Sequence, residues 1–167
     1  MAFWTFLSCH NKGTNNNLAS VPSKQQIAKV DTVGKEKFSY TIDYGKYIVD
    51  TFSGKRAKIN YSSSKTAKRF RSTIRWSIDN FGTDFAGHYN LAMWGCGTDC
   101  LNGAITDLKT GRVYDIPPAS LDYKFKQNSR LLVINPPDSL GYYDSCSYCE
   151  PELWLWNDNK KKFEKLN

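Results

Sequence analysis

The stretch of sequence that decides the fold is Phe85-Ala86-Gly87-His88-Tyr89-Asn90-Leu91-Ala92-Met93-Trp94-Gly95-Cys96-Gly97-Thr98-Asp99-Cys100. Within it, Tyr89, Leu91 and Met93 alternate with smaller or more polar residues, which is the period of two of a half-buried strand. Glycines flank Cys96, and glycine adopts backbone conformations that a side chain forbids. The stretch therefore predicts a strand that ends in a tight turn, where the sulfur of Cys96 has a fixed role.

Strand signals continue on both sides of this stretch. Apolar runs between Gly, Pro, Asn and Asp predict further strands, over residues 38–44, 47–52 and 57–61 before it and 103–108, 112–116, 121–125, 131–134, 153–156 and 162–166 after it. A long loop is expected over residues 136–149. Because strands follow strands with short links, we expect a mainly antiparallel, twisted sheet of about eight or nine strands.

One amphipathic helix is expected over residues 64–79. Ala67, Phe70, Ile74 and Ile78 recur at spacings of three and four and form one apolar stripe. A preceding serine can cap this helix and a following glycine can end it. The basic residues on its opposite side are Lys65, Lys68, Arg69, Arg71 and Arg75. The fold class is α+β, with a core that includes Phe70, Ile74, Leu91, Met93, Ile105, Val113, Leu132, Ile134 and Leu155.

Composition and charge are those of one basic globular domain. The chain has 167 residues, 40% hydrophobic and 14% aromatic, which is enough for a substantial core. We assign residues 36–167 to a single β-rich domain and residues 1–35 to a signal remnant, a tether and a polar lead-in. The formal net charge of +7 attracts anionic partners, although surplus surface lysine gives the same charge without a function.

The N-terminal segment resembles that of an exported lipoprotein. Phe6-Leu7-Ser8-Cys9 is similar to a bacterial lipobox, whose cysteine is lipidated and becomes the first residue of the mature protein. The polar residues 10–17 would then form a flexible tether. The apolar run is short and has no basic segment ahead of it, so an ordinary chain terminus is the alternative. We expect lipidation of Cys9, a periplasmic or outer-surface location, and membrane contact only through that anchor.

The remaining four cysteines predict disulfides. In an exported protein, Cys96, Cys100, Cys146 and Cys149 pair with one another. The sequence allows three connectivities, and we favour the local pairs 96–100 and 146–149. A zinc-stabilised module is the alternative, because Cys-x3-Cys and Cys-x2-Cys can supply four thiolates to a tetrahedral ion.

A catalytic alternative uses Cys96 as the nucleophile of a hydrolase or transferase. His88 would be its base, and Asp99 would orient the imidazole. If residues 89–94 form one extended strand, at ~3.3 Å per residue, His88 and Cys96 lie at its opposite ends, more than about 20 Å apart. Cys146 and Cys149 have redox spacing but lie in a loop with no helix after them. We therefore favour a protein without catalytic activity or a cofactor.

An exposed aromatic and basic surface is the third candidate site. Trp76 is expected to project with Arg69 from the basic side of the helix, where it can stack on a base, a sugar or an aromatic partner. Packing of Trp76 beneath a neighbouring segment is the equal alternative. With His88, Tyr89 and Trp94, these residues are our candidate binding set. We expect a protein or glycan partner in the envelope. A nucleic-acid partner is not expected, because export removes the chain from cellular nucleic acid.

At residues 85–100, the chain resembles a family of uncharacterised exported bacterial proteins. They carry a similar F-A-G-H-Y segment, then W-G-C-G-T-x-C, then a strand–turn–strand like residues 103–116 and a final aromatic hairpin like residues 154–163. The resemblance covers roughly residues 50–167 and implies export and a shared architecture, but no catalytic residue. Because the sequence has no convincing acid/base pair, phosphate loop or nucleophile elbow, and predicts a tether and disulfides, we expect a non-catalytic binding domain of the bacterial cell envelope, of an inhibitor or immunity type.

Overall fold

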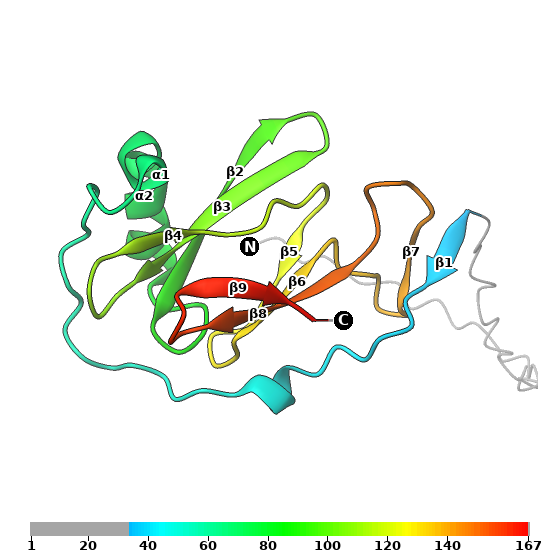
Figure 1. Cartoon of the computed structure of the whole chain (residues 1–167), viewed down its shortest axis with the longest axis horizontal. Helices are drawn as coiled ribbons and strands as arrows, with labels where there is room; N and C mark the ends of the chain where they lie inside the picture. The colour runs from blue at the N-terminus through cyan, green and yellow to red at the C-terminus, as the bar shows by residue number, and fades with distance from the viewer. Residues whose placement is uncertain (1–33, 167) are drawn as a thin grey trace, which may run out of the picture. The chain divides into compact units, whose positions relative to one another are not determined.

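Three antiparallel sheets and one helical segment build the domain (Figure 1). The computed structural model describes residues 34–166, so the predicted tether and Cys9 lie outside the described residues. In spatial order, the first sheet contains β2 (Tyr89–Gly97), β3 (Cys100–Asp107) and β4 (Val113–Asp115), and the second β5 (Tyr123–Lys124), β6 (Leu131–Ile134), β8 (Glu152–Asn157) and β9 (Lys162–Lys165). The third pairs β1 (Lys35–Lys37) with β7 (Tyr142–Asp144). The α+β class is confirmed, with the strands divided among three sheets.

The β2–β3 hairpin is the centre of the domain, because both of its faces are buried. On one face, Leu91 and Ile105 lie opposite each other across the ladder and share a core with Trp156 of the second sheet. On the other face, Ala92 packs in a core with Ile74 of the helical segment. The layers therefore run from helix to first sheet to second sheet. Each fully buried large apolar side chain contributes about 1.5–3 kcal/mol.

The outer part of this hairpin leaves the core. Met93 is 39% exposed although it shares a face with Leu91, because β2 and β3 extend beyond the strands that cover them (Figure 1). The prediction of Met93 as a core residue is therefore wrong. Leu155 is only half-buried, since the face of β8 that enters the central core carries Trp156.

The predicted helix is present but broken at Phe70. Its two parts are α1 (Lys65–Arg69) and α2 (Arg71–Phe81). Ser64 caps the start, because its hydroxyl accepts the N–H of Ala67 at 2.9 Å. Gly82 ends the segment with a φ of +62°, in the region that favours glycine. Phe70 lies between the two parts with φ −106° and ψ 25°, so the helical phase is not continuous across it.

Residues 38–61, which we call the strap, do not form the three predicted strands. The strap contains a short 3-10 helix, η1 (Tyr44–Tyr47), and one isolated bridge at Ile48. Its backbone bonds mostly to loops: the N–H of Phe52 donates to the Gly87 carbonyl at 2.8 Å, and that of Asn60 to the Gly111 carbonyl at 2.8 Å. Alternating burial of side chains, as at Tyr44, thus arises here without a strand ladder.

Two glycines let the strap lie close to the sheets. Gly87 and Gly111 have φ values of +78° and +76°. A Cβ at Gly87 would lie 2.3 Å from the Asp50 carbonyl oxygen, and one at Gly111 would lie 1.9 Å from that of Lys58. Both positions therefore require glycine for conformation and for space. The predicted long loop 136–149 also differs from expectation, because it contains β7.

Candidate functional site

The four cysteines of the described residues form two local disulfides, the pairing that we favoured from sequence. Cys96 is joined to Cys100 across the end of the β2–β3 hairpin, and Cys146 to Cys149 after β7, with Cα separations of 5.1 and 5.2 Å. Disulfides persist in oxidising compartments, so the pairing indicates a non-reducing, exported environment. Neither helix within residues 34–166 has the length and apolar character to span a bilayer.

The zinc alternative has no ligand set in this arrangement. Zinc would need the four sulfurs as thiolates around one point. The structure instead uses each sulfur in a bond to its near neighbour. In the part of the chain that the structure describes, no three His, Cys, Asp or Glu side chains are placed to hold a metal ion.

The catalytic alternative is not assembled either. His88 lies directly before β2, whereas Cys96 and Asp99 lie at the far end of the hairpin. Eight steps of extended chain place His88 about 26 Å from Cys96 at ~3.3 Å per residue. The Cys96 sulfur is also held in a disulfide and offers no thiolate. The structure therefore does not support Cys96 as a nucleophile.

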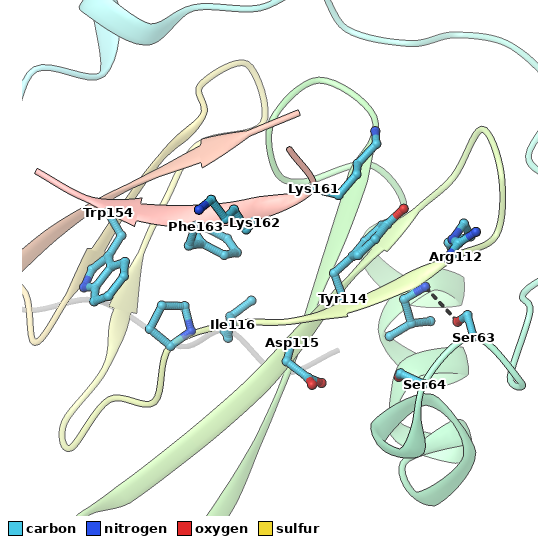
Figure 2. A pocket seen from close by; sticks show the side chains of 12 residues that line it. Ser63, Ser64, Arg112, Tyr114, Asp115, Ile116, Trp154, Lys161, Lys162 and Phe163 are labelled. Carbon is cyan, nitrogen blue, oxygen red and sulfur yellow. Dashed lines mark hydrogen bonds between the residues drawn. The ribbon is translucent and has the colours of Figure 1, made fainter. Parts of the chain in front are cut away.

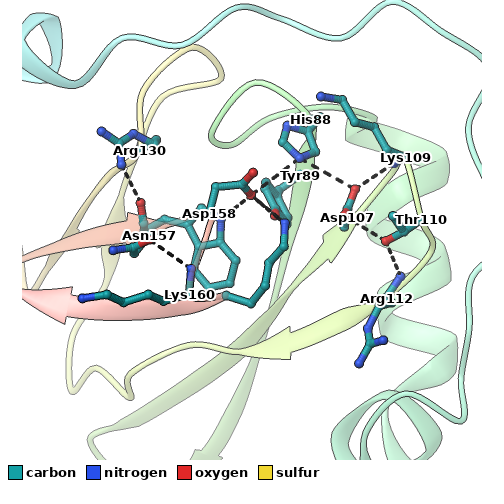
Figure 3. Close-up of polar contacts among 12 residues, drawn as sticks. His88, Tyr89, Asp107, Lys109, Thr110, Arg112, Arg130, Asn157, Asp158 and Lys160 are labelled. Atoms are coloured by element: carbon teal, nitrogen blue, oxygen red, sulfur yellow. Dashed lines mark hydrogen bonds and ion pairs between the residues drawn. The ribbon is translucent and has the colours of Figure 1, made fainter.

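His88 belongs instead to a polar cluster between the first and second sheets (Figure 3). Its Nε2 lies 3.8 Å from Oδ1 of Asp107 and 3.8 Å from Oδ1 of Asp158. The Tyr89 hydroxyl donates to Asp158, and Lys161 Nζ donates to the same oxygen at 2.9 Å. The cluster thus joins the start of β2 and the end of β3 to the turn between β8 and β9.

Burial, neighbouring charges and hydrogen bonds together shift the pKa values of this cluster. Burial lowers the pKa of His88 below its usual value and the nearby charge of Lys109 lowers it further, although the Asp107 and Asp158 carboxylates oppose this shift. Burial acts to raise the pKa of Asp158, but hydrogen bonds from Tyr89, Lys161 and Trp156 outweigh it and bring the pKa to about 2. Tyr89 is wholly buried and cannot touch a partner. The cluster is therefore a structural junction, and its two predicted binding residues do not form a contact surface.

A different set of residues surrounds a hollow between α1 and the outer part of the β2–β3 hairpin. We call this hollow the basic cleft. It has a volume of about 660 Å³ and is lined by Lys65, Thr66, Arg69, Phe70, Trp94, Gly95, Cys96 and Asn102. The structure thus brings together Arg69 and Trp94, two of the predicted binding residues. It also places the Cys96–Cys100 disulfide at the edge of the cleft.

An aromatic stack holds one cation beside the cleft. The rings of Phe70 and Trp94 are stacked, with centroids 4.0 Å apart and planes inclined by 14°. The guanidinium carbon of Arg69 lies 5.3 Å from the centroid of the Phe70 ring. A cation over an aromatic ring at an exposed site gains about 0.5–1 kcal/mol. The break in the helix at Phe70 directs the Phe70 ring toward Trp94. That ring in turn positions the guanidinium group of Arg69.

The charged and amide side chains of the basic cleft all present hydrogen-bond donors. Lys65 and Arg69 are cations, and none of the ion pairs among residues 34–166 involves either of them. Asn102 Oδ1 accepts the N–H of Gly103 at 2.8 Å, which leaves the amide NH₂ free to donate. The cleft can therefore receive a group that carries negative charge and acceptor oxygens.

A second hollow lies between β4 and β9, with a volume of about 500 Å³ (Figure 2). Figure 2 shows aromatic side chains from both strands along it. Its lysines are already paired: Lys161 Nζ lies 2.9 Å from Asp158 Oδ1, and Lys162 Nζ lies 3.9 Å from Glu164 Oε1. This groove therefore has less unbalanced charge to offer a ligand than the basic cleft has.

Trp76 lies apart from the basic cleft. Its side chain is 59% exposed and meets the Phe81 ring edge-on, with centroids 5.5 Å apart. It is not among the residues that line the cleft. A continuous helical phase would place Trp76 on the same side as Arg69, but the break at Phe70 interrupts that phase. Trp76 stays a predicted binding residue, on a separate exposed aromatic patch.

No protein-family model, curated protein or solved structure matches the chain. The resemblance of residues 85–100 to exported bacterial proteins therefore stays a prediction. The candidate site depends on its geometry alone.

The sequence places Lys65 and Arg69 on one face of the helix, because they are four residues apart. Asn102 carries no signal in the sequence. Its place follows from the ladder of β2 and β3, which sets it directly opposite Trp94.

Proposed function

We propose that this protein is a non-catalytic, exported binding domain that recognises a protein partner in the bacterial cell envelope. The observation that carries the proposal is the outer part of the β2–β3 hairpin, which we call the hairpin tip (residues 95–100). It is mostly exposed, closed by the Cys96–Cys100 disulfide, and adjacent to the basic cleft. An inhibitor or immunity-type role is the form of binding that fits an exported domain of this kind.

The constraints on the tip support a recognition role. The ladder shifts register between Gly95 and Gly97, and Asp99 has a φ of +49°. A disulfide across such a turn restricts the conformations of an exposed segment that contributes little to the core. Binding by a segment that is already ordered loses less conformational entropy. The Cys96–Cys100 disulfide therefore favours affinity for the partner, whereas the inner part of the hairpin packs in the core.

A lipid anchor at Cys9 belongs to the same proposal. Anchoring would hold the binding domain at the envelope, where its partner is expected. Mass spectrometry of the protein expressed in a bacterial host tests this part, because lipidation would add acyl mass at Cys9 and a Cys9→Ala variant would lack it. An unmodified N-terminus in a host that lipidates other proteins would contradict the anchor, but not the binding role.

Site-specific photo-crosslinking tests the binding role. A photoreactive amino acid replaces Thr98 at the exposed tip, and a control replaces Ser53, which is exposed in the strap. We expect one envelope protein to be crosslinked from Thr98 and not from Ser53. Equal products from both positions, or none from the tip under conditions that crosslink a known envelope complex, would refute recognition by the hairpin.

A further inference from the structure

The basic cleft has a more specific chemistry than a generic basic surface. Lys65 and Arg69 are four residues apart on α1, where like charges destabilise a helix by about 0.2–0.5 kcal/mol. No carboxylate among the described residues forms an ion pair with either, although the chain pairs Arg75, Lys160 and other cations in this way. The two charges are therefore arranged at some cost to the helix and face a hollow with no acidic lining.

We infer that the basic cleft binds the carboxylate of an acidic side chain in a polypeptide segment of the partner. Lys65 and Arg69 supply the charge, and the free amide of Asn102 adds a neutral donor. Arg69, supported by the Phe70 ring, can grip a carboxylate with two N–H groups. This inference rests on the proposed function, because it names what the partner inserts beside the hairpin tip.

The backbone at the edge of the cleft favours a polypeptide as the occupant. The register shift pairs Gly95 with Leu101 and Gly97 with Cys100, so Cys96 has no ladder partner among the described residues. Cys96 is exposed there and lies at the edge of the cleft, where the main chain of a partner segment can run beside it. Half of the aromatic surface that a sugar ring would stack upon is already used, since Phe70 and Trp94 cover each other. An acidic peptide therefore uses more of this site than a glycan or a lipid headgroup would.

The experiment uses a synthetic peptide with four glutamates as the probe, and the same peptide with glutamines as its control. Binding to the disulfide-intact protein is followed by NMR, through the side-chain amide of Asn102 and the indole N–H of Trp94. We expect the glutamate peptide to shift both signals and the glutamine peptide to shift neither. Added salt should weaken the binding, because exposed charges are screened.

Matched variants separate the cleft from overall charge. The variant Lys65→Gln/Arg69→Gln removes two charges from the cleft, and Lys55→Gln/Lys58→Gln removes two exposed charges elsewhere. We expect the first to weaken peptide binding by about tenfold or more and the second by less than about twofold, since a charge-assisted hydrogen bond is roughly twice as strong as a neutral one. Asn102→Asp keeps the acceptor for the Gly103 N–H but replaces the donor, and it should abolish the shift of the Trp94 indole N–H.

Three outcomes would overturn the inference. One is equal weakening by the two double variants. Another is tighter binding at the cleft by a sulfated glycan fragment or by anionic vesicles than by the glutamate peptide. The third is a partner that crosslinks to Thr98 with the same yield in the Lys65→Gln/Arg69→Gln variant, which would leave the proposed function intact. Peptide binding at the cleft without any partner at the tip would instead support the inference and contradict the proposed function.

Discussion

Removal of the Cys96–Cys100 disulfide should cost little stability and most of the partner binding. The perturbation is Cys96→Ala/Cys100→Ala. The disulfide closes a loop with a sequence separation of 4, for which chain entropy gives a stabilisation of about 2 kcal/mol. The ladder from Tyr89 to Gly95 and the two cores beneath it do not depend on this bond. The variant should therefore keep its fold.

The second disulfide provides a matched control. Cys146–Cys149 closes a loop with a sequence separation of 3, for which the same relation also gives about 2 kcal/mol. Cys146→Ala/Cys149→Ala should lower the free energy of unfolding by a similar amount, plus a small packing loss because Cys149 is buried. It should leave binding at the hairpin tip unchanged, since this disulfide is not part of the tip or the basic cleft.

The assay combines urea unfolding, followed by tryptophan fluorescence, with crosslinking from Thr98 and peptide binding at the cleft. We expect both double variants to lose about 2 kcal/mol and only the first to lose binding by tenfold or more. Equal losses of binding in the two variants would refute a specific role of the Cys96–Cys100 disulfide in partner binding. A loss of stability above about 5 kcal/mol in the first variant would show that the tip belongs to the core.

The remaining predictions concern the strap, a buried carboxyl and the aromatic stack. Gly111→Ala should destabilise the domain by about 2 kcal/mol or more, because it is strained at φ +76° and its Cβ would displace the strap, whereas Gly95→Ala, with open space around it, should cost less than about 0.5 kcal/mol in urea unfolding. Burial raises the pKa of Asp84 to about 7, so the unfolded state releases the Asp84 proton at lower pH than the folded state, and the free energy of unfolding should fall as pH rises from about 4 to 7. Asp84→Asn should remove this fall, and a fall that persists in the variant would contradict the assignment to Asp84. Phe70→Leu keeps apolar volume but loses the ring beneath Arg69, so it should cost about 1 kcal/mol in thermal unfolding and weaken peptide binding severalfold; unchanged binding would show that the ring does not position the guanidinium.

The sequence predicted those elements whose side-chain pattern and backbone bonding agree. The hairpin around Gly111, the apolar strand Leu131–Ile134 and the capped start at Ser64 are present as expected. The strap has the sequence pattern of strands, because its apolar residues alternate with polar ones, although Tyr40 and Ile48 of that pattern are exposed. Its backbone nevertheless bonds to loops. An alternation of apolar and polar residues does not by itself show that the backbone pairs with another strand. A segment that crosses a sheet can therefore have the sequence pattern of a strand.

The candidate site was predicted in part. Arg69 and Trp94 both line the basic cleft, whereas His88 and Tyr89 lie at the opposite end of β2 in a buried junction. Burial could not be read from the alternation, because Tyr89 sits on the same face as the exposed Met93. The point at which a hairpin outgrows its covering sheet depends on the lengths of both sheets, and that information is not local.

The position of the hairpin tip outside the core also has an evolutionary consequence. Residues 95–99 are exposed, and the described structure around Gly95 and Gly97 leaves open space at both. Substitutions at Gly95 and Thr98 are therefore nearly free of folding constraints, as is usual for surface connections on a rigid scaffold, whereas Cys96 is held in the disulfide and Gly97 has a φ of +141° that strains other residues. In the proposed binding role, the chain can change its partner through substitutions at exposed positions of the tip while it keeps the same inner hairpin.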